Sequence, residues 1–513
     1  MRTPVPAGSA APTAAGAPRA LTWSSLSARA RALSGPLTRR DGTVLLAACV
    51  AVAVLSVLLP STPTYDPWSW LTWGREILHL DLNTLQGPSW KPLPVLFTTV
   101  FALFGAAAPD LWLVVARAGG FFAMVMIFRL AVRLTPRQTA LLAGFLGVVT
   151  VCATGNFVRD VALGNSEGLL VAFMLLAIER HVDGHRRQTF ALGFLSALLR
   201  PETWPFLFVY GLWLLWRDRG AWKLVLGLFA VLPLLWLGPE LWGSGNLFRA
   251  ASRASNPNPN SPAYSKHPAL TVLQNARPVL FTPGKVGAVI AILVGLVATA
   301  RRRRLSLELV IALSAALWLL TVAALTQAHF SGNPRYLIPA SGMLSVLGGA
   351  GWGWLAAQGG WLARRTGRPA RATAATVIAA VLVVGAFAPS TYRRLQLLHK
   401  IEVALHYQAI VRDRFVAVVD RVGGHEPVLA CGKPYAGKFL IPMVAWYLKT
   451  PGIKIAFDPA APGARPGVVL SARTTRREDP VPIPPPAFKP VAASGPWHVF
   501  AHCSPGRSLR ARA

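Results

Sequence analysis

The sequence predicts an α-helical polytopic membrane protein with about eleven transmembrane helices and a small external C-terminal α/β domain. Hydrophobic residues make up 53% of the 513 residues and charged residues only 14%, a composition typical of membrane proteins. Long apolar runs recur between residues 41 and 390, and each is close to the length of a helix that crosses a bilayer. Beyond residue 390 the hydropathy falls and strand-like segments alternate with Gly and Pro turns, which predicts a separate extracytoplasmic domain at 391–513.

The formal net charge of +32 indicates contact with a lipid bilayer and no nucleic-acid partner. Lys and Arg concentrate in short connections between apolar runs, where they meet anionic headgroups and fix the orientation of the chain. Residues 1–40 are rich in Ala, Pro, Ser and Arg and contain no acid. They predict a disordered basic cytoplasmic tail.

Eleven apolar runs define the predicted transmembrane domain at 41–390. Basic clusters near 133–137, 180–187, 217–223, 301–304 and 364–371 fall on one side, which the positive-inside rule assigns to the cytoplasm. An odd number of spans in the plasma membrane then places the C-terminus outside. Two short runs flank the segment RPETWP at 200–205, whose prolines predict a broken helix pair. The runs lie at 44–59, 111–134, 138–153, 161–179, 188–201, 203–216, 222–242, 284–300, 305–326, 335–357 and 373–389.

The first external loop, at 61–110, and the C-terminal domain each give a local prediction. The segment 92–105 is apolar but short, with prolines at its start, and predicts an interfacial helix on the outer leaflet. The segments 427–431, 453–457 and 497–501 predict strands. Cys431 and Cys503 both lie in the external domain, so an oxidising compartment favours a disulfide between them, whereas Cys49 and Cys152 are interpreted as packed thiols within spans.

The segment KPLPVLFTTVFALFG at 91–105 is followed by Arg117 and by a span ending FRLAVRL at 128–134. This order resembles the basic segment, amphipathic helix and basic-ended span of the membrane glycosyltransferases of the GT-C fold. LLRPETWP at 198–205 is similar to the break after the family's paired inner helices, and NPRYLIP at 333–339 resembles the start of a late span. The resemblance covers residues 60–390. Many relatives carry two adjacent acids or an Asp-Glu pair in the first loop, whereas here Asp66 has no adjacent acid and is followed by Pro67.

The resemblance implies inverting transfer of a sugar from a polyprenyl-phosphate donor to a glycan or protein acceptor at the outer face. Such a reaction needs a carboxylate near the acceptor hydroxyl and cations near the departing phosphate. Asp66 is the candidate base, with Asp160 and Glu167 as alternates. A structural role is open for each: Asp66 as a helix cap, and the other two as helix-start acids or partners of Arg159.

Arg200 and Arg335 are the main candidates for binding the donor phosphate, with Lys91 and Arg159 as further ones. An unpaired guanidinium at the end of a span is costly, and its fork geometry suits phosphate. Internal ion pairs are an equally open alternative, between Arg200 and Glu202 or between Arg335 and an acid of the first loop. Lys91 has the alternative of extending its amine to the interface.

The candidates for substrate contact are aromatic or polar residues close to these charges. The tryptophans also have a common role as interfacial anchors, and the histidine as a hydrogen-bonding loop residue. No metal-binding signature is present, so no cofactor is expected, although a divalent cation fits some members of the resembled fold. The substrate candidates are Trp68, Trp90, Glu202, His329 and Tyr336.

Two other functions compete with sugar transfer: a lipid or sugar transporter, and an inactive scaffold of the same fold. Broken helices and intramembrane arginines suit a transporter as well, but the chain lacks two matching hydropathy halves. Transport predicts functional polar residues at the depth of the bilayer centre. Transfer predicts that they gather at the outer mouth.

Overall fold

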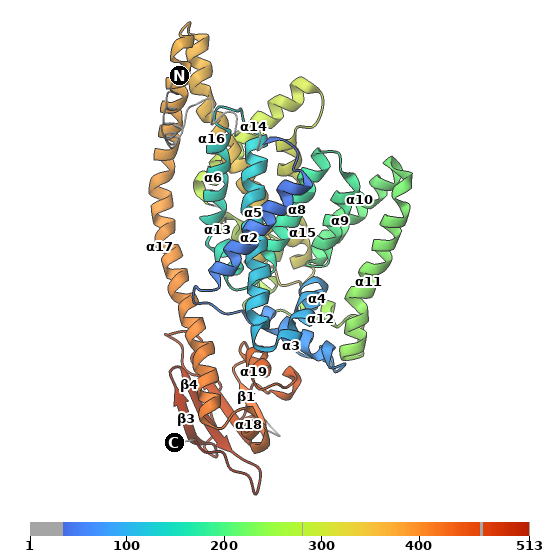
Figure 1. Ribbon diagram of the computed structural model, residues 1–513, viewed down its shortest axis with the longest axis vertical. Helices are drawn as coiled ribbons and strands as arrows, with labels where there is room; N and C mark the ends of the chain where they lie inside the picture. Colours follow the sequence, from blue (N-terminus) through green and yellow to red (C-terminus); the bar gives the residue numbers. More distant parts are fainter. Residues whose placement is uncertain (1–33, 280, 462–464, 512–513) are drawn as a thin grey trace, which may run out of the picture.

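The computed structural model describes residues 34–279, 281–461 and 465–511. A body of packed helices is followed by one long helix that leads to a small sheet (Figure 1). This architecture confirms the predicted fold class, a polytopic helical membrane protein with a small C-terminal domain. Residues 1–33 of the predicted tail lie outside the described residues.

Each predicted apolar run falls on one helix of the body. Five helical segments of the described chain are long and apolar enough to cross a membrane, and the pair α6 and α7, bent by 73°, would make a sixth. The count of eleven spans stays a prediction for the other runs, since their helices are shorter, more charged or less apolar. The helices are α2 (Arg39–Ser56), α5 (Ala108–Arg133), α6 (Ala140–Cys152), α8 (Glu167–Val182), α9 (Arg186–Ala197), α10 (Trp204–Arg217), α11 (Trp222–Ser244), α14 (Thr282–Arg302), α15 (Leu307–Gln327), α16 (Ile338–Arg365) and α17 (Ala372–Arg421).

Shorter helices fill the connections. In the first loop, α3 (Tyr65–Leu78) is followed by α4 (Pro92–Phe101), whose two prolines stand in the first turn, where a missing N–H is tolerated. A 3₁₀ turn at Ala102–Ala107 then separates α4 from α5, so the segment predicted as a short helix is a distinct element. Its place in the outer leaflet stays a prediction. The remaining connecting helices are α7 (Gly155–Ala162), α12 (Arg249–Ala254) and α13 (Pro268–Val279).

The predicted break at 200–205 is present. Helix α9 ends at Ala197, a 3₁₀ turn occupies Pro201–Thr203, and α10 begins at Trp204. Arg200 is extended, with φ −151° and ψ 128°, because the ring of a following proline disfavours the helical region for the residue before it. The break therefore turns the Arg200 side chain away from the helix axis and towards the neighbouring elements.

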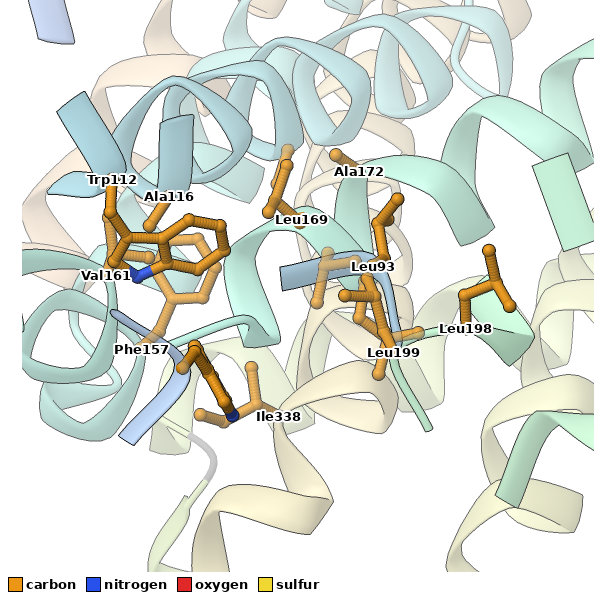
Figure 2. Packing of buried hydrophobic residues seen from close by; sticks show 14 of the residues in the cluster. Leu93, Trp112, Ala116, Phe157, Val161, Leu169, Ala172, Leu198, Leu199 and Ile338 are labelled. Carbon is orange, nitrogen blue, oxygen red and sulfur yellow. The ribbon is translucent and has the colours of Figure 1, made fainter. Parts of the chain in front are cut away.

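A dense apolar core lies where these connecting elements meet the body. Figure 2 shows five residues of this buried cluster: Leu93 of α4, Trp112 of α5, Val161 of α7, Leu169 of α8 and Ile338 of α16. All five side chains are buried, and burial of a large apolar side chain contributes about 1.5–3 kcal/mol. The core thus holds together segments from across the whole first two thirds of the chain.

The C-terminal domain is reached through α17, which runs unbroken from the helical body to the sheet (Figure 1). The predicted domain boundary at residue 390 falls inside this helix. The sheet has the order β1-β2-β4-β3, with β1 (Lys433–Ala436) parallel to β2 (Gly467–Ala472). Antiparallel pairing joins β2 to β4 (Trp497–His502) and β4 to β3 (Lys489–Ser494).

Of the three strands predicted for this domain, one is confirmed and two are wrong. The segment 497–501 lies in β4, as predicted. The segment 427–431 belongs instead to helix α18 (His425–Cys431), because Glu426 and Pro427 occupy the first turn of a helix, where an acid and a proline are favoured. The segment 453–457 holds a 3₁₀ turn and one isolated bridge, from Ala456 to Tyr435.

The cysteine predictions are confirmed. Cys431 and Cys503 form a disulfide with their Cα atoms 4.5 Å apart, which ties α18 to the chain end beyond β4. Cys49 is a buried free thiol and Cys152 is a half-buried one. The disulfide closes a loop of 72 residues, a length for which chain-entropy arguments give about 4 kcal/mol of stabilisation.

The predicted orientation can be tested by labelling single cysteines at positions 302 and 420, in a variant whose two free cysteines are replaced by alanine. Arg302 ends α14 beside a basic cluster, and Asp420 lies near the end of α17. A membrane-impermeant maleimide applied to whole cells should label position 420 and spare position 302. Labelling of both positions, or of position 302 alone, would overturn the orientation.

Candidate active site

A cavity of about 880 Å³ lies between the first loop, at 61–110, the break after α9 and the start of α16. Its wall combines residues of α3, α7, α11 and α12 with the 3₁₀ turn Pro334–Leu337. Most of the residues that the sequence singles out are brought together here. Those that line it are Asp66, Trp90, Lys91, Arg159, Asp160, Arg200, Glu202, Arg335 and Tyr336.

The pair of Asp66 and Arg335 closes one side of the cavity. Nη2 of Arg335 lies 2.6 Å from Oδ2 of Asp66, and its Nη1 lies 3.5 Å from Oδ1 of Asn165. Asp66 stands in the first turn of α3, where a carboxylate is favoured by the helix dipole. The proposed pairing of Arg335 with a first-loop acid is therefore realised in this structure.

Glu167 joins the two arginines behind the cavity wall. Its Oε1 accepts a hydrogen bond from Nη2 of Arg200 and lies 4.0 Å from Nε of Arg335. Glu167 is only 1% exposed, so both contacts lie in a medium where charges interact strongly. Glu167 itself does not line the cavity.

Arg200 is held on three sides. Its Nη1 donates to Oε1 of Glu202 over 3.1 Å, its other terminal nitrogen contacts Glu167, and its guanidinium carbon lies 3.9 Å from the ring centre of Tyr336. The internal pair with Glu202 was the alternative to phosphate binding left open by the sequence, and it forms. Arg200 is nevertheless one of the residues that line the cavity.

Lys91 turns inward and does not extend to the interface. Its amine donates to Oγ of Ser166 over 3.1 Å and lies 5.2 Å from the ring centre of Trp70. Burial and, next, the nearby Arg200 lower the pKa of Lys91 to about 8. Burial and, next, the neighbouring Asp66 raise the pKa of Tyr65, another residue of the cavity wall.

Asp160 and Arg159 take different places on α7. Asp160 is buried and accepts a hydrogen bond from Nδ2 of Asn165 over 3.1 Å. Arg159 is exposed on the cavity wall. Asn165 and Ser166, which sequence reasoning missed, thus connect Asp160, Arg335 and Lys91. Short neutral polar residues carry no charge or hydropathy signal. The one signal that could have identified Asn165 and Ser166 is that they directly precede Glu167 in the sequence.

Two of the predicted substrate residues lie outside the cavity wall. Trp68 packs against Trp446 and Tyr447 of the C-terminal domain, because residues two apart on a helix point about 200° apart and Asp66 takes the cavity side. His329 is exposed with φ 67° just beyond α15. Its N–H bonds the carbonyl of Thr326 over 3.1 Å, which is the hydrogen bond of a left-handed helix cap.

The charged residues are positioned by apolar neighbours in the sequence. Each lies within three residues of a side chain in the core of Figure 2, so packing fixes the backbone from which it projects. Close contact between α3 and α4 adds to this: a Cβ on Gly74 would lie 2.5 Å from the backbone of Thr98. The neighbouring pairs are Lys91 with Leu93, Asp160 with Val161, Glu167 with Leu169, Arg200 with Leu199, and Arg335 with Ile338.

Comparison with known proteins identifies the fold. No protein-family model and no curated protein matches this sequence. Among solved structures, the apo form of ArnT from Cupriavidus metallidurans matches with a TM-score of 0.55 and 14% identity. The form bound to undecaprenyl phosphate matches with a TM-score of 0.53 and 13% identity, and both matches cover 90% of this chain and 98% of the ArnT chain. The chain has the GT-C fold. This confirms the resemblance seen in the sequence.

The acids around the cavity are engaged in ion pairs and hydrogen bonds within the protein. In the part of the chain that the structure describes, no three His, Cys, Asp or Glu side chains gather in a way that would hold a metal ion. The acids named above are paired instead with arginines or an amide. The arrangement offers fixed cations and the carboxylates of Asp66, Asp160 and Glu202 to a molecule in the cavity.

Replacing Glu167 by glutamine should destabilise the protein by about 3–5 kcal/mol, the usual cost of removing one partner of a buried ion pair. The reason is that Arg200 and Arg335 share Glu167 as a counter-charge. Thermal unfolding in detergent, followed by tryptophan fluorescence, measures the effect. Asp218→Asn is the matched control, since it breaks the exposed pair with Arg187 and should shift the midpoint little. Equal midpoints for the two variants would contradict the bridging role.

Proposed function

We propose that this chain is a glycosyltransferase that moves a sugar from a polyprenyl-phosphate donor to an acceptor at the outer face of the membrane, with inversion at the anomeric carbon. The observation that carries this proposal is the meeting of Asp66 with Arg335, Arg200 and Lys91 at one cavity. A carboxylate and fixed cations are the two requirements of such a transfer. The GT-C fold, shared with an ArnT structure bound to undecaprenyl phosphate, supports a lipid-phosphate donor.

The cations serve the leaving group. As the bond from the anomeric carbon to the phosphate oxygen breaks, its electron pair passes to that oxygen and negative charge grows on the phosphate. Arg200, Arg335 and Lys91 face the cavity in positions set by Glu167, Glu202 and Ser166, so they need little rearrangement to stabilise that charge. Arg335 suits phosphate further because a guanidinium binds two oxygens at once.

Asp66 serves the acceptor. Its Oδ2 is held by Arg335, which leaves Oδ1 to accept the proton of an acceptor hydroxyl. The hydroxyl oxygen forms the new bond to the anomeric carbon on the face opposite the phosphate, and this direction of attack inverts the configuration. A base placed in this way typically contributes a factor of about 10² to 10⁴ in rate.

The alternate bases fit less well into this scheme. Glu167 is behind the wall and shared by two arginines, a place for a positioning residue. Asp160 is committed to Asn165. The gathering of the polar candidates around one cavity also supports transfer over transport, which needs polar groups along a path through the bilayer.

Asp66→Asn should lower the rate of sugar transfer by about 10²- to 10⁴-fold, because the amide cannot accept the proton at neutral pH. The measurement uses purified protein with a panel of polyprenyl-phosphate-linked hexoses and pentoses. Asp110→Asn is the control, an exposed acid in the first turn of α5 that does not line the cavity, and it should transfer at the wild-type rate. A wild-type rate of transfer in Asp66→Asn would exclude Asp66 as the base and leave Asp160 and Glu167 as the candidates.

The apparent KM for the donor should rise as the pH passes about 8, because Lys91, whose pKa is lowered to about 8, then loses the positive charge that attracts phosphate. Lys91→Arg should lack this rise, since a guanidinium stays protonated throughout. Lys91→Met should show a high KM that no longer changes between pH 7 and 9. If Lys91→Arg keeps the wild-type pH profile, another group is responsible.

A further inference from the structure

The C-terminal domain reaches the cavity through one aromatic side chain. Phe439 lines the cavity together with Tyr65 and Asp66, and the other described lining residues belong to the helical body. Phe439 is 57% exposed. A large apolar ring that faces a cavity and does not enter the core contributes little to folding, so its position invites a role in binding.

The backbone around Phe439 is held firmly on both sides. It lies in a turn between β1 and α19 (Ile441–Tyr447), in which the N–H of Leu440 bonds the carbonyl of Gly437 over 2.7 Å. On one side, β1 is paired with β2 in the sheet. The ring is therefore presented from a defined turn and not from a free loop.

On the other side, α19 is docked on α3, the helix that carries Asp66 (Figure 1). Arg75 of α3 donates to the carbonyl oxygens of Ala445, Trp446 and Thr450 over 3.2, 2.8 and 3.1 Å. A cation beside the carbonyls at the C-terminal end of a helix is a favourable partner for them. Because of this clamp, Phe439 and the candidate base belong to one packed unit.

Tyr65 and Phe439 form an aromatic pair beside the base. Their ring centres lie 5.8 Å apart at an angle of 81°, the edge-to-face arrangement that aromatic quadrupoles favour. Tyr65 immediately precedes Asp66 in the chain. A molecule whose hydroxyl reaches Asp66 from the side of the C-terminal domain therefore passes against these two rings.

The donor lipid has other apolar surfaces available. Trp236 and Leu237 of α11 and Val322 and Leu325 of α15 also line the cavity, and both helices are long and apolar enough to cross a membrane. A polyprenyl chain extends into the bilayer, so we expect it to contact these helices. Tyr65 and Phe439 are then free to contact the acceptor.

We propose that Tyr65 and Phe439 form the acceptor subsite and that the acceptor is a sugar ring of a glycan, stacked on the face of Phe439 with one hydroxyl directed at Asp66. The proposal rests on the proposed glycosyltransferase function. The C–H groups on one face of a sugar ring carry a small positive charge, and an aromatic face is negative. A flat apolar ring beside a carboxylate thus fits the two faces of a sugar, one apolar and one rich in hydroxyls.

The kinetic test compares Phe439→Ala and Phe439→Trp with the control Phe457→Ala, which removes a half-exposed phenylalanine of the same domain away from the cavity. The acceptor probes are methyl glycosides, with 1-butanol as a probe that has a hydroxyl but no ring. Phe439→Ala should raise the KM for a methyl glycoside about tenfold, the size expected for one aromatic contact. Phe439→Trp and Phe457→Ala should keep the wild-type value.

An unchanged KM in Phe439→Ala would overturn the subsite. An equal rise for 1-butanol and for the glycosides would overturn the glycan and indicate a plain apolar contact, because the loss would not depend on a ring. Donor KM in Phe439→Ala should match the wild type. A rise in donor KM alone would assign the ring to the donor and likewise overturn the proposal.

A binding measurement separates this proposal from the proposed function. Saturation-transfer NMR of methyl glycosides with the protein in lipid nanodiscs needs no turnover. Transfer of magnetisation to the C–H groups of the sugar in the wild type and in Phe457→Ala, and its loss in Phe439→Ala, supports the subsite even if no donor in the panel is used. Absence of the signal in the wild type overturns it. If the signal is present while the wild type transfers no sugar, the proposed function fails and the sugar site stands.

Discussion

The arrangement of the site depends on one buried carboxylate, Glu167, placed between two arginines. Each guanidinium would cost several kcal/mol to bury without a counter-charge, and Glu167 serves both of them. Arg200 comes from the break after α9 and Arg335 from the turn before α16. Because Glu167 lies at the start of α8, its contacts with the two arginines bring together the start of α8, the break after α9 and the turn before α16.

Pairing with carboxylates explains how two arginines can be kept in fixed positions at the cavity. Arg200 is also paired with Glu202, and Arg335 with Asp66. The carboxylates neutralise the arginines enough for both to be retained near the apolar core, yet they occupy only part of each guanidinium. Under the proposed function, a phosphate at the cavity would meet donors whose orientation is already determined, which is the condition under which electrostatic stabilisation costs no reorganisation.

Features that depend on neighbouring residues in the sequence could be predicted, whereas contacts between segments far apart in the sequence could not. Apolar runs predicted the body helices because bilayer thickness dictates their length, and prolines predicted the break at Arg200. The pairing of two cysteines followed from their shared domain. The bridging role of Glu167 could not be predicted, since it depends on segments that tertiary packing brings together. Nor could the side of α3 that faces the cavity, which decides between Asp66 and Trp68.

The C-terminal domain completes the restraint on Asp66. One face of α3 is pressed on α4 at Gly74, while Arg75 and Trp68 bind α19 on the other. The loop behind it is pinned as well, through Arg249, which donates to the carbonyl of Pro88 over 2.7 Å. A catalytic group must be held to within a fraction of an ångström to be effective. The packing of α3 against α4 and α19 would therefore hold Asp66 in the place that its proposed role as base requires.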